Sequence, residues 1–224
     1  FKAGNRVAGG RYLLKDGWRT AYGRFVETCL VKVTLEDGAF GWGEATEPVC
    51  PEVVGILAAG FFGDLLPGQR FADRAAFRDF AYDLNRCRGH TAGYQLLAIA
   101  ALDIAISDAL GRRAGVAIAG GRKVPVYLSG LRQGTREARV TFWGERHAEG
   151  IGGVKLFGDA DVDHLLGEID ALRDGGPRDW SIMVDSLWTM RPGEGAHAAA
   201  AAFAERGVGW WECPFDPEEV APHR

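Results

Sequence analysis

The order of apolar and polar positions predicts an α+β domain in the first half of the chain. Apolar and polar residues alternate along 25–45 and are interrupted by Glu36-Asp37-Gly38, which predicts a β-hairpin with a tight turn. Helical periodicity follows over 51–88, with a break at Pro67-Gly68. Residues 92–113 are rich in alanine and leucine and predict a long helix that is buried on almost every side.

The pattern changes from Val124 onward, where short apolar runs alternate with amphipathic segments. The apolar runs are VPVYLSG, GGVKLF, SIMVDSLW and GVGWWECPF, and the amphipathic segments are 134–150, 160–174 and 194–206. Strands that alternate with helices are typical of βαβ units and a parallel sheet. We therefore expect an α+β domain over 1–121 and an α/β domain over 122–224.

Composition and charge narrow the class of protein. Apolar residues make up 47% and charged residues 25% of the 224 positions, which is typical of a folded globular chain. The net charge is −4 and no segment clusters lysine and arginine on one face, so we expect no nucleic-acid partner. No apolar run approaches the roughly 18 residues that a membrane span needs, so we expect no membrane partner. Four widely spaced cysteines without a CxxC motif favour a reduced, cytoplasmic protein.

Three of the predicted strands finish with an ionisable residue, namely Lys155, Asp185 and Glu212. Ligands gather at the carboxyl ends of parallel strands, and two carboxylates on neighbouring strands are suitable ligands for Mg²⁺. A lysine beside them could hold an anionic substrate, or move a proton if its pKa were lowered. The alternative is that Asp185 only caps a turn and that Glu212 is only solvated.

Six segments together resemble the mandelate racemase and muconate lactonizing enzyme branch of the enolase superfamily. They are VKVTLEDGAFGWGEA, LAIAALDIAISDALGRRAGVAIAGG, VPVYLSG, GVKLF, MVDSLW and WWECPF, in this order along the chain. The resemblance implies an enolase-like capping domain followed by the first half of a (β/α) TIM-type barrel.

The resemblance also implies a chemistry for this edge of the barrel. Asp185 and Glu212 would be Mg²⁺ ligands, and Lys155 would contact the substrate or assist proton transfer. The family abstracts a proton α to a carboxylate and stabilises the resulting enediolate with Mg²⁺. We therefore expect a small-molecule carboxylate substrate, specifically a sugar acid, and a homo-oligomer in the full-length form.

The sequence departs from the family pattern at two places. Phe157 stands where the family commonly has a second lysine that acts as a base, and Ser186-Leu187 replaces a pair that ends in asparagine. A phenyl ring cannot accept a proton, so Phe157 favours a sugar-acid dehydratase that gives a 2-keto-3-deoxy acid. The alternatives are a racemase, epimerase or cycloisomerase of the same superfamily, or a truncated protein with only a binding or assembly role.

Two further residues are candidates for the substrate pocket. Trp188 follows the predicted metal ligand Asp185, and His90 lies between predicted helices of the capping domain. The chain starts at Phe1 and ends at Arg224, before a full barrel of eight strands is reached. We therefore expect a fragment, with a third metal ligand and a further base beyond Arg224.

Overall fold

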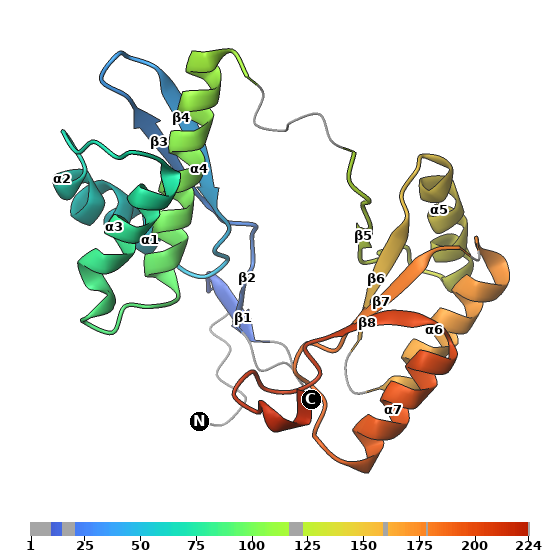
Figure 1. Cartoon of the computed structure of the whole chain (residues 1–224). Coiled ribbons are helices and arrows are strands. Elements are labelled where there is room, and N and C mark those ends of the chain that lie inside the picture. The colour runs from blue at the N-terminus through green and yellow to red at the C-terminus, as the bar shows by residue number, and fades with distance from the viewer. Residues whose placement is uncertain (1–9, 15–20, 117–122, 159–160, 178, 224) are drawn as a thin grey trace. The chain divides into compact units, whose positions relative to one another are not determined.

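The computed structural model describes residues 10–14, 21–116, 123–158, 161–177 and 179–223. These residues belong to two compact units, which are described separately below (Figure 1). The first unit contains the described residues up to 116, and the second contains those from 123 onward. The expected domain boundary between 121 and 122 lies outside the described residues, so it stays a prediction.

Two antiparallel hairpins form the strands of the first unit. The predicted hairpin is confirmed as β3 (Cys29–Thr34) paired with β4 (Phe40–Ala45), with Gly38 at φ +86° in the turn. A glycine suits this turn because a positive φ is unfavourable for other residues. A second, shorter hairpin, which the sequence did not indicate, joins β1 (Tyr12–Leu14) and β2 (Ala21–Gly23).

The predicted helices of the first unit are also present. They are α1 (Glu52–Ile56), the π-helical η1 (Leu57–Phe62), α2 (Gly63–Leu65), α3 (Arg74–Arg86) and α4 (Tyr94–Ala114). Helix α4 packs so closely on β4 that a Cβ atom added at Gly41 or Gly43 would come within 2.2 Å of the backbone of α4. Two glycines in the strand thus allow the backbones of strand and helix to approach.

Helix α4 is long and apolar enough to cross a membrane, by length and composition only, with a mean hydropathy of 1.4. The expectation that no segment is long and apolar enough to cross a membrane was therefore wrong. Its two aspartates nevertheless bind other elements of the first unit. Asp103 pairs with Arg74 of α3 at 2.7 Å, and the carboxylate of Asp108 accepts a hydrogen bond from the backbone N–H of Trp42. These contacts are those of a core helix in a folded unit.

The second unit is a parallel sheet with helices between its strands, as the alternating pattern predicted (Figure 1). The strands lie in the order β5 (Leu128–Ser129), β6 (Gly153–Phe157), β7 (Ser181–Asp185) and β8 (Val208–Glu212). The helices are α5 (Arg136–Ala148), α6 (Val162–Gly175), α7 (Glu194–Glu205) and the short 3₁₀ helix η2 (Ala221–His223). This arrangement is that of the first half of a (β/α) barrel. The first strand is shorter than expected, since only two residues of VPVYLSG pair with β6.

Candidate metal centre

The two faces of the parallel sheet differ in what covers them. Residues on the helix side form the core of the second unit, and the strand residues in that core are Val154, Leu156, Ile182 and Val184. Side chains alternate along a strand, so the residues between them point to the opposite face. That face contains Lys155 and Phe157 on β6 and Asp185 at the end of β7. Phe157 is 46% exposed and Trp210 of β8 is 60% exposed.

A one-residue irregularity in the register of β7 and β8 places Glu212 opposite Asp185. The shift lies between Ile182 and Met183, and beyond it Asp185 pairs with Glu212. If the pairing continued without this shift, Trp211 would stand opposite Asp185, because a slip of one residue exchanges the faces of a strand. The bulge therefore brings the two carboxylates to one edge and one face of the sheet.

Lys155 reaches this pair of carboxylates from the middle of β6. It was expected to end its strand, but the strand continues to Phe157, which is the residue in register with Asp185. The long side chain of Lys155 spans the difference. Its Nζ lies 2.9 Å from Oε2 of Glu212 and 3.6 Å from Oδ2 of Asp185.

The surroundings of Lys155 keep its ammonium charged. Burial lowers the pKa, but the hydrogen bond to Glu212 and the negative charges of Glu212 and Asp185 outweigh burial, so the pKa is raised above its ordinary value of 10.5. Proton transfer by Lys155 would need a lowered pKa. The metal-free geometry has the opposite effect, so a base role for Lys155 requires another cation to engage the two carboxylates.

Backbone groups after the strands hold Asp185 in place. Its carboxylate is buried, and Oδ1 accepts a hydrogen bond of 3.0 Å from the backbone N–H of Leu187. Leu187 and Trp188 have φ values of +52° and +58°, a region that is uncommon for residues other than glycine. The N–H of Trp188 donates to the carbonyl of Cys213 at 2.7 Å. The turns that follow β7 and β8 are therefore joined to each other.

Ser186 and Leu187, the departures from the family pattern, have clear partners. Ser186 is fully buried, its hydroxyl accepts a hydrogen bond of 2.8 Å from the indole N–H of Trp211, and its backbone N–H donates to the carbonyl of Glu212 at 3.0 Å. At Leu187 the backbone N–H, and no side-chain amide, is the donor to Asp185. The side chain of Ser186 thus helps to fix the strand residue beside Glu212, whereas the contact at Leu187 is made by its backbone and does not depend on its side chain.

The structure brings one of the three predicted pocket residues into direct contact with this cluster. The ring centroid of Phe157 lies 5.2 Å from Nζ of Lys155. Trp188 is half-buried in the turn after Asp185. His90 is exposed in the loop between α3 and α4 of the first unit. The substrate contacts expected of these residues stay predictions.

The donor atoms fit a divalent cation. One carboxylate oxygen of Asp185, one of Glu212 and the sulfur of Cys213 all lie within 4.8 Å of one another. Carboxylate oxygens are the ligands that Mg²⁺ prefers. The positively charged ammonium of Lys155 lies close to both acids, which shows that a cation can be accommodated there. Asp185 and Glu212 would hold Mg²⁺, which would stabilise negative charge on a bound substrate.

Cys213 was not among the residues that the sequence suggested. It directly follows Glu212, so alternation along the strand would send its side chain away from the acids. Its φ of +48° breaks that alternation. Burial, and then the charges of Asp185 and Glu212, raise the pKa of the Cys213 thiol, so the thiol is protonated at neutral pH in the metal-free protein.

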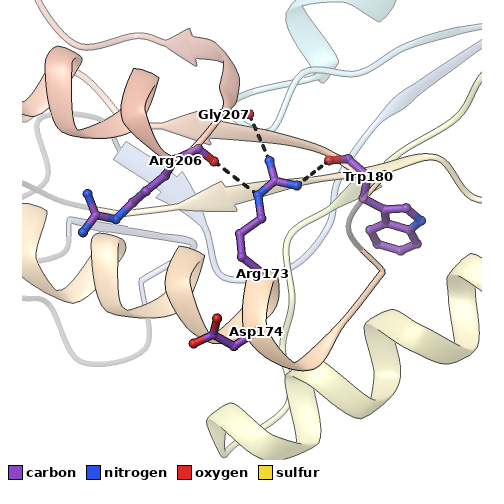
Figure 2. Close-up of a pocket in the computed structure, with 5 residues that line it drawn as sticks. All are labelled: Arg173, Asp174, Trp180, Arg206 and Gly207. Atoms are coloured by element: carbon purple, nitrogen blue, oxygen red, sulfur yellow. Dashed lines mark hydrogen bonds between the residues drawn. The ribbon is translucent and has the colours of Figure 1, made fainter.

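A hollow at the opposite end of the strands has a structural role (Figure 2). It is lined by Arg173, Asp174, Trp180, Arg206 and Gly207, which precede β7 and β8 or end the helices before them. The guanidinium of Arg173 donates to the carbonyls of Trp180, Arg206 and Gly207 at 2.9–3.2 Å. Arg173 therefore ties the end of α6 to the start of two strands.

The fold and the paired acids define the class of protein: a capping α+β domain joined to a (β/α) barrel sheet with its polar residues at the carboxyl edge. Residues 15–120 match the family model of the mandelate racemase / muconate lactonizing enzyme N-terminal domain. The chain belongs to the enolase superfamily, as the six sequence segments indicated.

Three relatives illustrate the similarity. The chain is 29% identical over 203 residues to the D-galactarolactone cycloisomerase of Agrobacterium fabrum, covering 85% of this chain and 52% of the relative. A solved member of the enolase superfamily from Agrobacterium tumefaciens is 31% identical with a TM-score of 0.85, covering 99% of this chain and 58% of that one. A racemase from Streptomyces coelicolor with bound magnesium is 25% identical with a TM-score of 0.70, and the match covers 86% of this chain and 60% of that one. The chain thus spans about half the length of its curated relative.

Proposed function

We propose that the product of the complete reading frame that encodes this chain abstracts a proton α to the carboxylate of a sugar-derived acid, with Mg²⁺ as cofactor. The main support is the in-register pair Asp185 and Glu212, with Lys155 beside both acids. Membership of the enolase superfamily agrees with this chemistry. Relatives named as a D-galactarolactone cycloisomerase and as a racemase with bound magnesium also agree with it.

The acids and the lysine of this centre have different proposed roles. Asp185 and Glu212 would hold Mg²⁺, and a bound Mg²⁺ would supply positive charge that stabilises negative charge developing on the substrate. With these carboxylates engaged by a metal, Lys155 would lose its contacts with Asp185 and Glu212 and could donate its N–H groups to the substrate carboxylate. A lysine is ordinarily protonated at neutral pH, so its ammonium would supply hydrogen-bond donors and a positive charge to the substrate carboxylate.

Phe157 favours dehydration as the outcome of the reaction. Its ring lies on the substrate face of the sheet beside Lys155, where the family commonly has a second lysine. Racemisation through two bases needs a proton donor on each side of the substrate carbon, and a phenyl ring supplies none. Dehydration needs only one base for the α-proton and an acid that helps hydroxide to leave. We therefore favour a sugar-acid dehydratase with a 2-keto-3-deoxy product.

Cycloisomerisation is the second candidate. It is favoured by the relative named D-galactarolactone cycloisomerase, and it is also compatible with a single base. Racemisation and a non-catalytic binding role are the further alternatives.

The free thiols of Cys29, Cys50, Cys87 and Cys213 fit a cytoplasmic location, where thiols stay reduced.

The test is turnover by the product of the complete reading frame that encodes this chain, called the encoded protein below. It is incubated in D₂O with Mg²⁺ and a panel of sugar acids and their lactones, and the products are examined by NMR and mass spectrometry. A product that has lost one water, apart from any deuterium taken up, supports dehydration. An isomer with a rearranged skeleton, heavier only by deuterium from the solvent, supports cycloisomerisation, and deuterium at an inverted carbon of the unrearranged acid supports racemisation.

Two variants make this test specific. Asp185→Asn removes one carboxylate charge and should abolish turnover and Mg²⁺-dependent exchange. Phe157→Lys restores a possible second base and should add deuterium exchange from the other side of the substrate carbon. Turnover that persists in Asp185→Asn, or the absence of Mg²⁺-dependent exchange with every acid, would contradict the proposed chemistry.

A further inference from the structure

Cys213 differs from the two acids in the kind of metal that it favours. Its sulfur lies within 4.8 Å of a carboxylate oxygen of Asp185 and of Glu212. A metal–sulfur bond of about 2.3 Å and a metal–oxygen bond of about 2.0–2.2 Å at the tetrahedral angle place the two ligand atoms of one Zn²⁺ ion about 3.6 Å apart. Side-chain movements of about 1 Å would therefore bring all three donor atoms to one cation.

The orientation of the thiol is fixed by its backbone. Cys213 has a φ of +48°, and its carbonyl accepts the hydrogen bond from the N–H of Trp188 at 2.7 Å. The side chain is half-buried, and its sulfur lies within 4.8 Å of a carboxylate oxygen of Asp185. Consecutive residues of β8 and its continuation, Glu212 and Cys213, thus offer donor atoms to the same place.

We infer that Asp185, Glu212 and Cys213 form a mixed oxygen and sulfur site that binds thiophilic divalent cations, of the Zn²⁺ and Cd²⁺ class, in competition with Mg²⁺. Magnesium favours oxygen ligands and gains nothing from a thiol, whereas zinc and cadmium bind sulfur strongly. The inference rests on the proposed function in using the same two carboxylates. It adds that this centre is open to inhibition by soft metals at Cys213.

Binding of such a cation includes the loss of one proton. The sulfur–metal bond forms as the S–H bond breaks, and the proton goes to the buffer, so no oxidation or reduction takes place. The ammonium of Lys155 must also leave Oε2 of Glu212, from which it is 2.9 Å away. Both changes are driven by the new metal–ligand bonds.

The experiment is a titration of the encoded protein with Cd²⁺ alone, followed by the ultraviolet sulfur-to-cadmium charge-transfer band. We expect the band to saturate at one equivalent in the unmodified protein and to be lost in Cys213→Ser. We expect the Cd²⁺ affinity of Cys213→Ser to fall at least ~10-fold, while its Mg²⁺ affinity changes by less than ~3-fold. Cys87→Ser is the matched control, because Cys87 is exposed at the end of α3 and should not affect the band.

A second measurement needs no variant of Cys213. In the unmodified protein, Cd²⁺ should slow alkylation of Cys213 by iodoacetamide, as read from the peptides, and should leave Cys87 as reactive as before. Persistence of the band in Cys213→Ser, or alkylation of Cys213 at an unchanged rate, would overturn the inference. Loss of Mg²⁺ binding is a separate result, since it concerns the carboxylates and the proposed function and is measured without Cd²⁺.

Discussion

Replacement of Lys155 by methionine removes the positive charge between two acids while keeping a side chain of similar length. In the structure, Nζ of Lys155 lies 2.9 Å from Oε2 of Glu212 and 3.6 Å from Oδ2 of Asp185. The side chains of Lys155 and Asp185 are 10% and 8% exposed, whereas that of Glu212 is 33% exposed. Lys155→Met therefore leaves one buried and one partly hydrated carboxylate without a counter-charge.

The size of the effect follows from these environments. Removal of one partner from a buried ion pair costs about 3–5 kcal/mol, and a hydrogen bond to a charged group contributes about 1.5–3 kcal/mol. Water compensates part of the loss at Glu212. We expect Lys155→Met to lower the free energy of unfolding of the second unit by about 2–4 kcal/mol.

The assay is urea unfolding followed by tryptophan fluorescence, in a double-mutant cycle with Asp185→Asn. Because Asp185→Asn removes one of the repelling charges, the double variant should be more stable than the sum of the two single losses predicts. Lys123→Met is the control, since Lys123 is exposed in the same unit. A change below about 0.5 kcal/mol for Lys155→Met, or strictly additive losses, would refute the view that Lys155 neutralises these acids.

Two further predictions concern the register of the sheet and its helices. Deletion of Gly209, the residue that the register shift leaves over in β8, should remove the bulge, keep Glu212 opposite Asp185 and retain Mg²⁺ binding by calorimetry. An alanine inserted between Trp211 and Glu212 should instead take the place opposite Asp185 and abolish Mg²⁺ binding. The second prediction is for Glu168 of α6. Burial raises its pKa, but hydrogen bonds from two arginines of α5 outweigh burial and lower it below 4.5. Its stabilising effect is therefore fully present above about pH 4.5 and is lost as the pH falls through the lower folded value, and Glu168→Gln should flatten this part of the stability–pH curve. An unchanged curve in Glu168→Gln would contradict this assignment.

Much of the fold follows from periodicity that is visible in the sequence. The hairpin of β3 and β4, the helix α4 and the alternation of strands and helices after Val124 were all predicted, because each has a strong apolar period of its own. Asp185 and Glu212 were candidate metal ligands in the sequence because they end apolar runs. Local sequence is enough for such features, since both the pattern and its consequence lie within one element.

Other features depend on contacts between distant parts of the chain. The bulge in β8, which brings Glu212 to Asp185, arises from pairing with β7 and is hinted at only by a glycine within a strand. The orientation of Cys213 depends on its positive φ, which alternation along a strand does not predict. The raised pKa of Lys155 depends on acids from two other strands. A lysine considered alone could equally have been a base.

The most direct test of the metal centre is binding of Mn²⁺, which prefers the same oxygen ligands as Mg²⁺ and is followed by electron paramagnetic resonance. The encoded protein, Asp185→Asn and Glu212→Gln are titrated side by side, with Glu168→Gln as a matched acid outside the centre. We predict one site in the unmodified protein and in Glu168→Gln, and its loss in the other two variants. Equal Mn²⁺ binding in all four proteins would mean that Asp185 and Glu212 do not hold the metal.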